Sequence, residues 1–150
     1  MKRSGFKRKP QKGPAKRSKL RKLGKSPISL IQRKLWQLCK EIIRKRYGNI
    51  CYTCGRAGLE GSNWHTGHMW PKAALGAYLK YDLRVLRPQD YHCNINLGGN
   101  GAVFYVKMLA EIGPEKMAQL EKDRQVTVRA YDHYSQLLIE YTKLNEELNS

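Results

Sequence analysis

Acidic side chains are scarce in this sequence. Its 150 residues contain 12 Asp and Glu against 29 Lys and Arg, which gives a formal net charge of +17. So large an excess of one sign predicts a polyanionic partner, and nucleic acid is the polyanion that fits best. An acidic membrane surface fits less well, because the basic segment at the beginning of the sequence has no apolar face.

Long hydrophobic runs are also missing. No stretch reaches about 18 uncharged apolar residues, so the sequence predicts no membrane-spanning helix. The basic N-terminus is not followed by an apolar segment, which indicates that it is not a secretory signal. The apolar fraction is nevertheless 41%, which is enough for the core of one domain of ordinary size.

Cysteine is rare, with four residues in the chain. In a sequence without a secretory signal, this number favours an intracellular protein, which we expect in the cytoplasm, over a disulfide scaffold. In such a protein a Cys-x-x-Cys pair indicates metal binding or redox chemistry. We expect Cys39, which lies on an apolar helical stripe, to be a buried free thiol and not a ligand.

The positive charge is concentrated near the N-terminus. Residues 1–25 hold 12 of the 29 basic side chains and no acidic one, together with several glycines and prolines. We interpret this segment as a disordered basic arm that binds phosphates without reading base sequence. Residues 26–150 are predicted to form the folded domain.

Apolar periodicity predicts mostly helices, with short strands between them. Ser26 and Pro27 form a helix start, and Gly48 ends the apolar stripe that follows. Thr127 is expected to cap the last helix, whose tyrosine-rich face suits either a homodimer interface or the monomer core. The predicted elements are helices over 27–47, 102–112, 115–123 and 127–148, and strands over 64–69 and 83–86.

A glycine-rich run follows the last cysteine at residues 98–101. It lacks the preceding strand and the following Lys-Ser/Thr of a phosphate-binding loop, so we expect no small-molecule organic cofactor there. We interpret the run as a turn between helices. Asn100 is expected either to adopt left-handed geometry or to cap the next helix.

The cysteines outside the first helix predict a structural zinc site. Cys51 and Cys54 have the C-x2-C spacing of two thiolate ligands, and Cys93 is the third candidate. The usual position of a fourth cysteine holds Asp90, whose carboxylate is also an accepted zinc ligand. His92 is the alternative fourth ligand, although its place next to Cys93 makes the geometry harder. A redox role is disfavoured because no βαβ pattern surrounds the pair.

Two histidines, His65 and His68, lie on the first predicted strand. Alternation along a strand places residues 65 and 67 on one face and residue 68 on the other. A bulge or a strand end could still bring both imidazoles to one site. Beside a zinc motif in a basic protein, the pair indicates a catalytic site.

These motifs together resemble a known family. The segments CYTCG (51–55), WHTGHMWP (64–71) and YDLRVLRPQDYHCNINLGGNG (81–101) are similar to the pattern of HNH (ββα-metal) nucleases. The resemblance is greatest to the phage NinG/Rap recombination proteins. It covers roughly residues 28–148 and is most specific over 50–101.

The resemblance implies an α+β fold with a small ββα-metal core, braced by a zinc knuckle and flanked by an N-terminal helix and C-terminal helices. In that core His68 matches the general base that activates water. Asn94 matches a ligand of the catalytic divalent ion, and His65 is placed to supply a second one. Because phosphodiester hydrolysis calls for a hard cation, we expect Mg²⁺ or Mn²⁺. The ligand set of Asn and His is weak and borderline, which permits Mn²⁺ or other transition ions.

Three positions depart from the family pattern. Gly67 replaces the common acid immediately before the base, and Asp90 replaces the first cysteine of the second pair. Val85 falls where the middle Asn of the pattern would hold a loop by hydrogen bonds, a role that Asp82 could take over. These departures leave the fold expected but allow a variant that binds DNA without cutting it.

The predicted function is therefore a metal-dependent endonuclease acting on branched DNA, such as Holliday junctions or D-loops in phage recombination. The first alternative is a zinc-knuckle nucleic-acid-binding protein without catalysis, and the second is an RNA- or ribosome-associated protein. The candidate phosphate-binding residues follow the predicted site in sequence or lie on the first helix. They are Lys72, Arg84, Arg87, Arg44, Lys45 and Arg46, with Arg33, Lys34 and Lys40 nearby on that helix.

Overall fold

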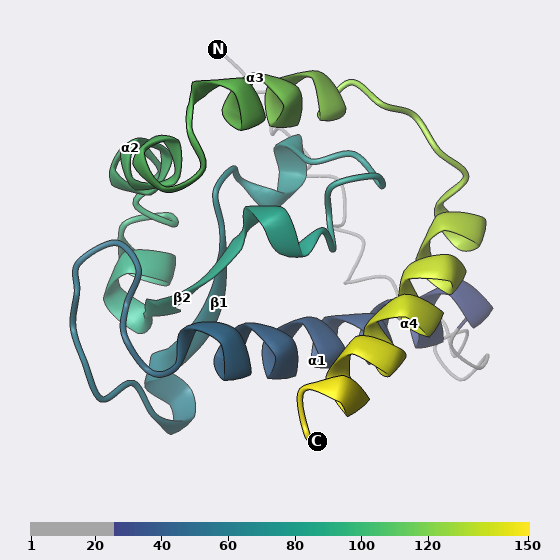
Figure 1. Ribbon diagram of the computed structural model, residues 1–150, viewed down its shortest axis with the longest axis horizontal. Helices are drawn as coiled ribbons and strands as arrows, with labels where there is room; N and C mark the ends of the chain where they lie inside the picture. Colours follow the sequence, from purple (N-terminus) through teal and green to yellow (C-terminus); the bar gives the residue numbers. More distant parts are fainter. Residues whose placement is uncertain (1–25) are drawn as a thin grey trace, which may run out of the picture.

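The computed structural model describes residues 26–150, and the predicted arm at 1–25 lies outside them. The described part is mostly helical and contains one two-stranded sheet, an α+β arrangement (Figure 1). None of its helices combines the length and apolar character needed to cross a membrane. The elements are α1 (Pro27–Tyr47), β1 (Trp64–His68), β2 (Leu86–Asp90), α2 (Gly101–Ile112), α3 (Pro114–Asp123) and α4 (Ala130–Glu147).

Helix α1 confirms the prediction from its apolar stripe. Pro27 occupies its first turn, and Gly48 ends it with a φ of 68°, a left-handed value that favours glycine. Leu35, Cys39 and Ile42 are fully buried on its inner face. Burial of Cys39 raises the pKa of its thiol to about 12, as expected for a free thiol in the core.

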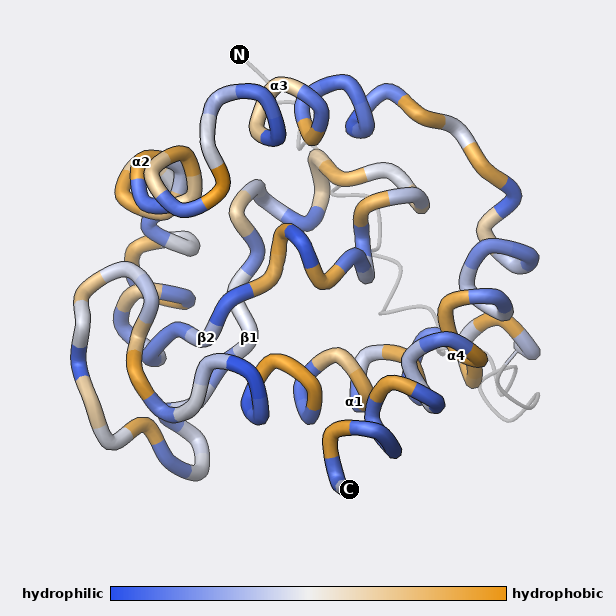
Figure 2. Tube along the Cα trace, viewed as in Figure 1, coloured by the Kyte–Doolittle hydropathy of each residue, from blue (hydrophilic) through white to orange (hydrophobic). Residues whose placement is uncertain are grey.

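Helix α4 packs against α1, with apolar and hydrophilic positions interleaved along both helices (Figure 2). Its Tyr134 and Tyr141 are buried in the core between them. The Tyr141 hydroxyl donates to the carbonyl of Tyr81 at 3.1 Å. Tyr134 and Tyr141 of the tyrosine-rich face therefore pack in the monomer core. This was the second of the two predicted alternatives, the first being a homodimer interface.

The prediction for the second strand was wrong in position. Residues 83–85 form a 3₁₀ turn, in which Asp82 accepts from the backbone N–H of Arg84 at 2.8 Å. The strand starts only at Leu86, and it pairs antiparallel with β1 from His68↔Leu86 to Trp64↔Asp90. Asp82 thus holds this loop by a hydrogen bond. Its substitution for the Asn of the family pattern stays a prediction.

The start of the last helix also differs from the prediction. Thr127 caps nothing, because α4 begins at Ala130 after an extended connection from α3 (Figure 1). Asn100 does adopt left-handed geometry, with a φ of 48°, but it makes no capping hydrogen bond. Its amide reaches the Cys93 sulfur at 4.0 Å instead.

Candidate functional site

Three thiols and one carboxylate converge beside the sheet. Cys51 and Cys54 lie in a tight turn after α1, Asp90 ends β2, and Cys93 lies in the single π-helical turn His92–Asn96 that follows. One ligand atom from each of the four residues lies within 4.8 Å of all the others. The structure therefore brings together the four residues predicted as zinc ligands.

The geometry of this Cys₃Asp cluster is compatible with a structural metal such as zinc. A tetrahedron with Zn–S bonds of about 2.3 Å has edges of roughly 3.8 Å, within the spread of the cluster. The Asp90 carboxylate already accepts from the backbone N–H of Cys93 at 2.6 Å and from the Cys54 thiol at 3.4 Å. His92, the alternative ligand, is exposed and contacts Asn96.

The thiols of the cluster differ in acidity. Burial alone would raise the pKa of Cys51, but hydrogen bonds from Thr53 and from backbone N–H groups lower it to about 7. Burial raises the pKa of Cys54 to about 12, with contributions from its hydrogen bonds to Cys51, Cys93 and Asp90. Metal binding displaces the thiol protons and leaves several anionic ligands close together. The positive charge of a bound cation would offset the electrostatic repulsion between them.

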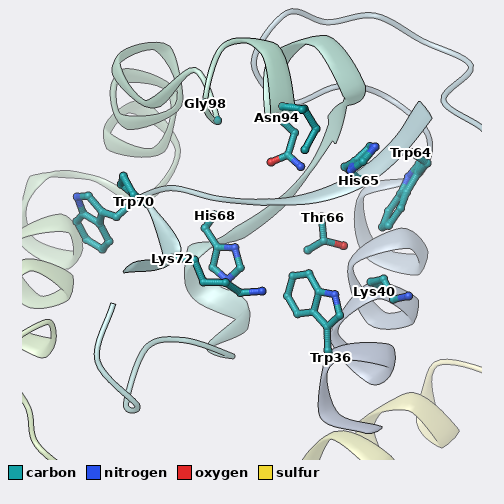
Figure 3. Close-up of a pocket in the computed structure, with 13 residues that line it drawn as sticks. Trp36, Lys40, Trp64, His65, Thr66, His68, Trp70, Lys72, Asn94 and Gly98 are labelled. Carbon is teal, nitrogen blue, oxygen red and sulfur yellow. The ribbon is translucent and has the colours of Figure 1, made fainter. Parts of the chain in front are cut away.

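A second site lies along the free edge of β1, where a pocket of about 420 Å³ opens (Figure 3). Side chains from both faces of β1 line it, and no residue of β2 does. The pocket thus collects the two predicted histidines, the predicted Asn94 and two lysines. Its polar and aromatic lining consists of Trp36, Lys40, Trp64, His65, Thr66, His68, Trp70, Lys72 and Asn94.

His68 is held from two directions. Its Nε2 lies 3.0 Å from the carbonyl of Lys80, and its ring stacks on Trp36 at 5.4 Å between centroids with planes 6° apart. A carbonyl can only accept, so Nε2 carries the proton and Nδ1 of the neutral ring holds the lone pair. Burial, aided by the charges of Lys72 and Lys80, lowers the pKa of His68 to about 4. The imidazole is therefore an unprotonated acceptor at neutral pH.

His65 is oriented in the same way on the other side of the strand. Its Nε2 lies 2.9 Å from the carbonyl of Ser62, and its ring packs edge-on against Tyr91. This leaves its Nδ1 as the acceptor, the arrangement usual for metal-binding histidines. Figure 3 shows His65 and Asn94 on one side of β1 and His68 on the other. The strand has no bulge, and the side chains share the pocket because it runs along the strand edge.

The predicted arginines lie elsewhere. Arg84 pairs with Asp82 at 2.6 Å and with Asp123 at 2.9 Å. Arg87 is 3% exposed and pairs with Glu111 at 2.6 Å. Neither lines the pocket of His68, because strand alternation and the 3₁₀ turn direct them toward α2 and α3.

The basic residues of α1 divide among several surfaces. Arg44 lies over the ring of Trp64 at 4.7 Å but does not itself line the pocket. Lys45 is bound to Asn145 of α4, and Arg46 lines a different hollow. Lys40 enters the pocket itself, and this places α1 beside the candidate catalytic residues.

Comparison with known proteins identifies the family. Residues 2–150 match the family described as Bacteriophage Lambda NinG protein. The chain belongs to the NinG family. "Protein ninG" of Escherichia phage 933W is 30% identical over 106 residues, which cover 70% of this chain and 51% of that protein. The protein of that name from Salmonella phage P22 is 30% identical over 108 residues, 71% of this chain and 52% of that protein.

The relative from Escherichia phage lambda, also named "Protein ninG", is 29% identical over 106 residues. These residues cover 70% of this chain and 50% of the phage lambda protein. The chain thus spans about half the length of the curated relatives that it matches. No solved structure matches it.

The pocket of this NinG family member includes residues that the sequence did not single out. Trp36, Thr66 and Trp70 line it. Thr66 and Trp70 lie in the motif segment 64–71 but were assigned no role, and Trp36 lies outside the motif segments. In the sequence, one feature of Trp36 pointed to the pocket: it lies at the edge of the apolar stripe, four residues before Lys40. A side chain at this position can pack one part of its ring on the core and leave the other part exposed to the pocket.

Gly67 has a local structural explanation in this family member. A Cβ at residue 67 would lie 1.9 Å from Oε1 of Gln89. Gln89 is fully buried, and its amide donates to Thr53 at 3.1 Å and to the carbonyl of Gly99 at 2.8 Å. An acid before His68 is therefore excluded while Gln89 keeps this position.

We expect Gly67→Ala to lower the free energy of unfolding by about 1–3 kcal/mol, because Gln89 must leave its hydrogen bonds. Urea unfolding measures this change. Gly76→Ala is the matched control, since its Cβ would meet nothing closer than 3.8 Å. The double variant Gly67→Ala/Gln89→Ala should lose less stability than the sum of its two single changes. Equal tolerance of alanine at residues 67 and 76 would contradict the explanation.

Proposed function

We propose that this NinG family member is a metal-dependent DNA endonuclease of the HNH type. One observation carries the proposal: the neutral, oriented imidazole of His68 shares a pocket with His65, Asn94 and two lysines. The hairpin β1–β2 and the helical turn after it would correspond to the ββα-metal core. The Cys₃Asp cluster would hold zinc and brace that core from outside.

The chemistry assigns a role to each group. Hydrolysis of a phosphodiester needs an activated water and neutralised phosphate oxygens. His68 would accept the water proton at Nδ1, while Lys72 and Lys40 would bind phosphate oxygens. His65 and Asn94 would hold a divalent cation, which when bound supplies positive charge to the phosphoryl oxygen and the departing 3′ oxygen.

The proposed substrate is branched DNA, such as a Holliday junction or D-loop formed in phage recombination. Support comes from the motif resemblance, from relatives in phages and from the net charge of +17. Two cuts would resolve a junction, so a homodimer is part of the proposal. Its interface would use a surface other than Tyr134 and Tyr141 of α4, which are buried in the monomer.

The proposal is tested by cleavage of a labelled four-way junction beside linear duplex and single strand. We expect the junction to be cut with Mn²⁺ and left intact with chelator. Mg²⁺ should be at least about tenfold less effective, because no carboxylate is among the described residues that line the pocket, and Mg²⁺ prefers carboxylate oxygen. Absence of products with every divalent ion would contradict the proposal.

The same missing carboxylate favours one rival function, a zinc-knuckle nucleic-acid-binding protein without catalysis. Gly67 stands where the family pattern has an acid, and the described pocket lining offers no other. Tight junction binding without cleavage in any metal would support this rival. Competition between junction DNA and RNA would further separate a DNA-binding protein from an RNA-associated one.

A further inference from the structure

All three tryptophans of the chain line the single pocket that contains His68. They come from separate segments: Trp36 from α1, Trp64 from the start of β1, and Trp70 from the turn after it. Figure 3 shows the three indoles placed around the edge strand. The hydrolytic roles proposed above use only Trp36, which orients His68, so the gathering of all three here needs a separate explanation.

Each indole is paired with a cation. Lys72 Nζ lies 4.4 Å from the ring centroid of Trp36. Arg44 lies 4.7 Å from the ring of Trp64, and Arg124 lies 4.8 Å from the ring of Trp70. All three tryptophans are only partly buried, so part of each ring is available for another contact beside its cation. The ring of Trp36 also stacks on His68.

The pocket is also positively charged. Lys40 and Lys72 line it, no acidic residue does, and neither lysine forms an ion pair within residues 26–150. Planar apolar rings beside unpaired cations match a ligand that has a planar aromatic part and a negative charge. A nucleotide has both, since its base stacks on aromatic rings and its phosphate binds lysine.

Base stacking within a duplex favours unpaired over paired DNA as the ligand. The pocket, with a volume of about 420 Å³, is large enough for one nucleotide. Within a duplex the faces of each base are covered by its neighbours, so indoles could contact them only after the base leaves the stack. We infer that this pocket binds one unpaired nucleotide of a DNA strand, with its base against the indoles and its phosphate on Lys40 and Lys72.

This inference deepens the proposed function and rests on it for the choice of DNA as ligand. Unpaired nucleotides occur in displaced and other single strands, so the pocket would explain selectivity for branched substrates that contain them, such as D-loops. The stack of Trp36 on His68 would bring the bound nucleotide next to the proposed base. Binding of the base does not itself require cleavage, and this allows the two proposals to be tested separately.

The location of the tryptophans makes their fluorescence a specific probe. With selective excitation of tryptophan, quenching reports the surroundings of Trp36, Trp64 and Trp70, since the chain has no other tryptophan. Trp36 also borders a hollow between α1 and α4, and Trp64 borders one beside Tyr91, so the dependence of quenching on the base is what identifies the shared pocket. The full chain is titrated in chelator, which prevents cleavage, with a short oligo(dT), an abasic oligonucleotide of equal length and a blunt duplex. Anisotropy of labelled oligonucleotides measures total binding in parallel.

We expect oligo(dT) to quench the fluorescence and to bind about 5- to 150-fold more tightly than the abasic strand, as stacking of one base predicts. The abasic strand and the duplex should bind through phosphates with little quenching. Trp64→Leu should remove the preference for oligo(dT), whereas Tyr131→Leu, an exposed aromatic residue on α4, should keep it.

Equal affinity for oligo(dT) and the abasic strand, or equal quenching by the duplex, would overturn the inference whatever the nuclease assay shows. Tighter binding and stronger quenching by oligo(U) would overturn the choice of DNA. Base-dependent quenching in a protein that never cuts DNA would refute the endonuclease alone and support the pocket as a nucleotide-binding site.

Discussion

Replacement of His68 by alanine is expected to lower the rate of metal-dependent junction cleavage by about 10²–10⁴-fold, the usual contribution of a positioned general base. Junction affinity should stay within about twofold, because the uncharged imidazole contributes no cation to phosphate binding. The reason is geometric: the Lys80 carbonyl and the Trp36 ring fix His68 with Nδ1 unprotonated. Single-turnover cleavage beside equilibrium binding measures both quantities.

The pH dependence gives a second test of the same assignment. A general base acts in its unprotonated form, and the pKa of His68 is lowered to about 4 by burial. The rate should therefore stay nearly constant as pH falls from 8 toward 5.5, and decline only as pH approaches about 4. An unperturbed histidine would already lose activity near pH 6.5, its ordinary pKa.

His92→Asn is the control for the His68 variant, because His92 is exposed and lies outside the pocket. It should cleave at nearly the wild-type rate. Full activity in the His68→Ala variant would remove His68 from the mechanism. An acid limb centred near pH 6.5 in wild type would show that the base is not the buried imidazole described here.

The sequence was most informative where one interaction dominates. The apolar stripe of α1 is read from the sequence because burial of one helical face decides its structure. The four residues of the Cys₃Asp cluster could be named because thiols and a carboxylate at this spacing are typical zinc ligands. Neither inference required knowledge of distant contacts.

Predictions failed where a local hydrogen bond or a distant contact decides the structure. The apolar residues 83–86 suggested a strand, but the Asp82 carboxylate turns that segment and shifts the strand to 86–90. The sequence suggests that Arg87 is a surface cation, yet it pairs with Glu111 of α2. The helix was predicted from the sequence, but its position beside β2 was not. Gly67 is explained only by the position of Gln89 across the sheet.

The residues of the candidate site also fall into two groups, those predicted from the sequence and those revealed only by the tertiary fold. His65, His68 and Asn94 were predicted from short motifs, and the structure brings them to one pocket. The wall formed by Trp36 was not predicted, because it depends on how α1 crosses the edge of β1. Residues from three remote segments can be assembled only by the tertiary fold.

Removal of metal is the second change expected to have a large effect. The segment from Asn49 to Asn63 contains only one short 3₁₀ turn, and its local core consists of Cys51, Leu59 and Cys93 with Trp64 packed beside it. Tyr52 adds a contact with Phe104 and a hydrogen bond to Glu111, but the segment has little other packing of its own. A metal crosslink through Cys51 and Cys54 would therefore contribute much of its stability. We expect a strong chelator to lower the melting temperature by more than about 10 °C and to remove hydrogen-exchange protection there first.

Two cysteine variants separate metal binding from packing. Cys39 is fully buried and bonded to the Tyr81 carbonyl, whereas Cys54 is exposed at the rim of the cluster. Packing alone predicts that Cys39→Ser costs about 1–3 kcal/mol and that Cys54→Ser costs within about 0.5 kcal/mol. Metal binding predicts the reverse, because Cys54→Ser deletes a ligand and should cost on the order of 3 kcal/mol or more.

The order of the two variants therefore decides whether the cluster holds metal. In metal-loaded protein, Cys54→Ser should be the less stable variant and should lose the one bound zinc that Cys39→Ser retains. In chelator the order should reverse, since only the packing cost remains. Urea unfolding with metal analysis of each purified variant measures both effects. If Cys39→Ser were the less stable variant under both conditions, the four residues would be a hydrogen-bonded cluster and not a metal site.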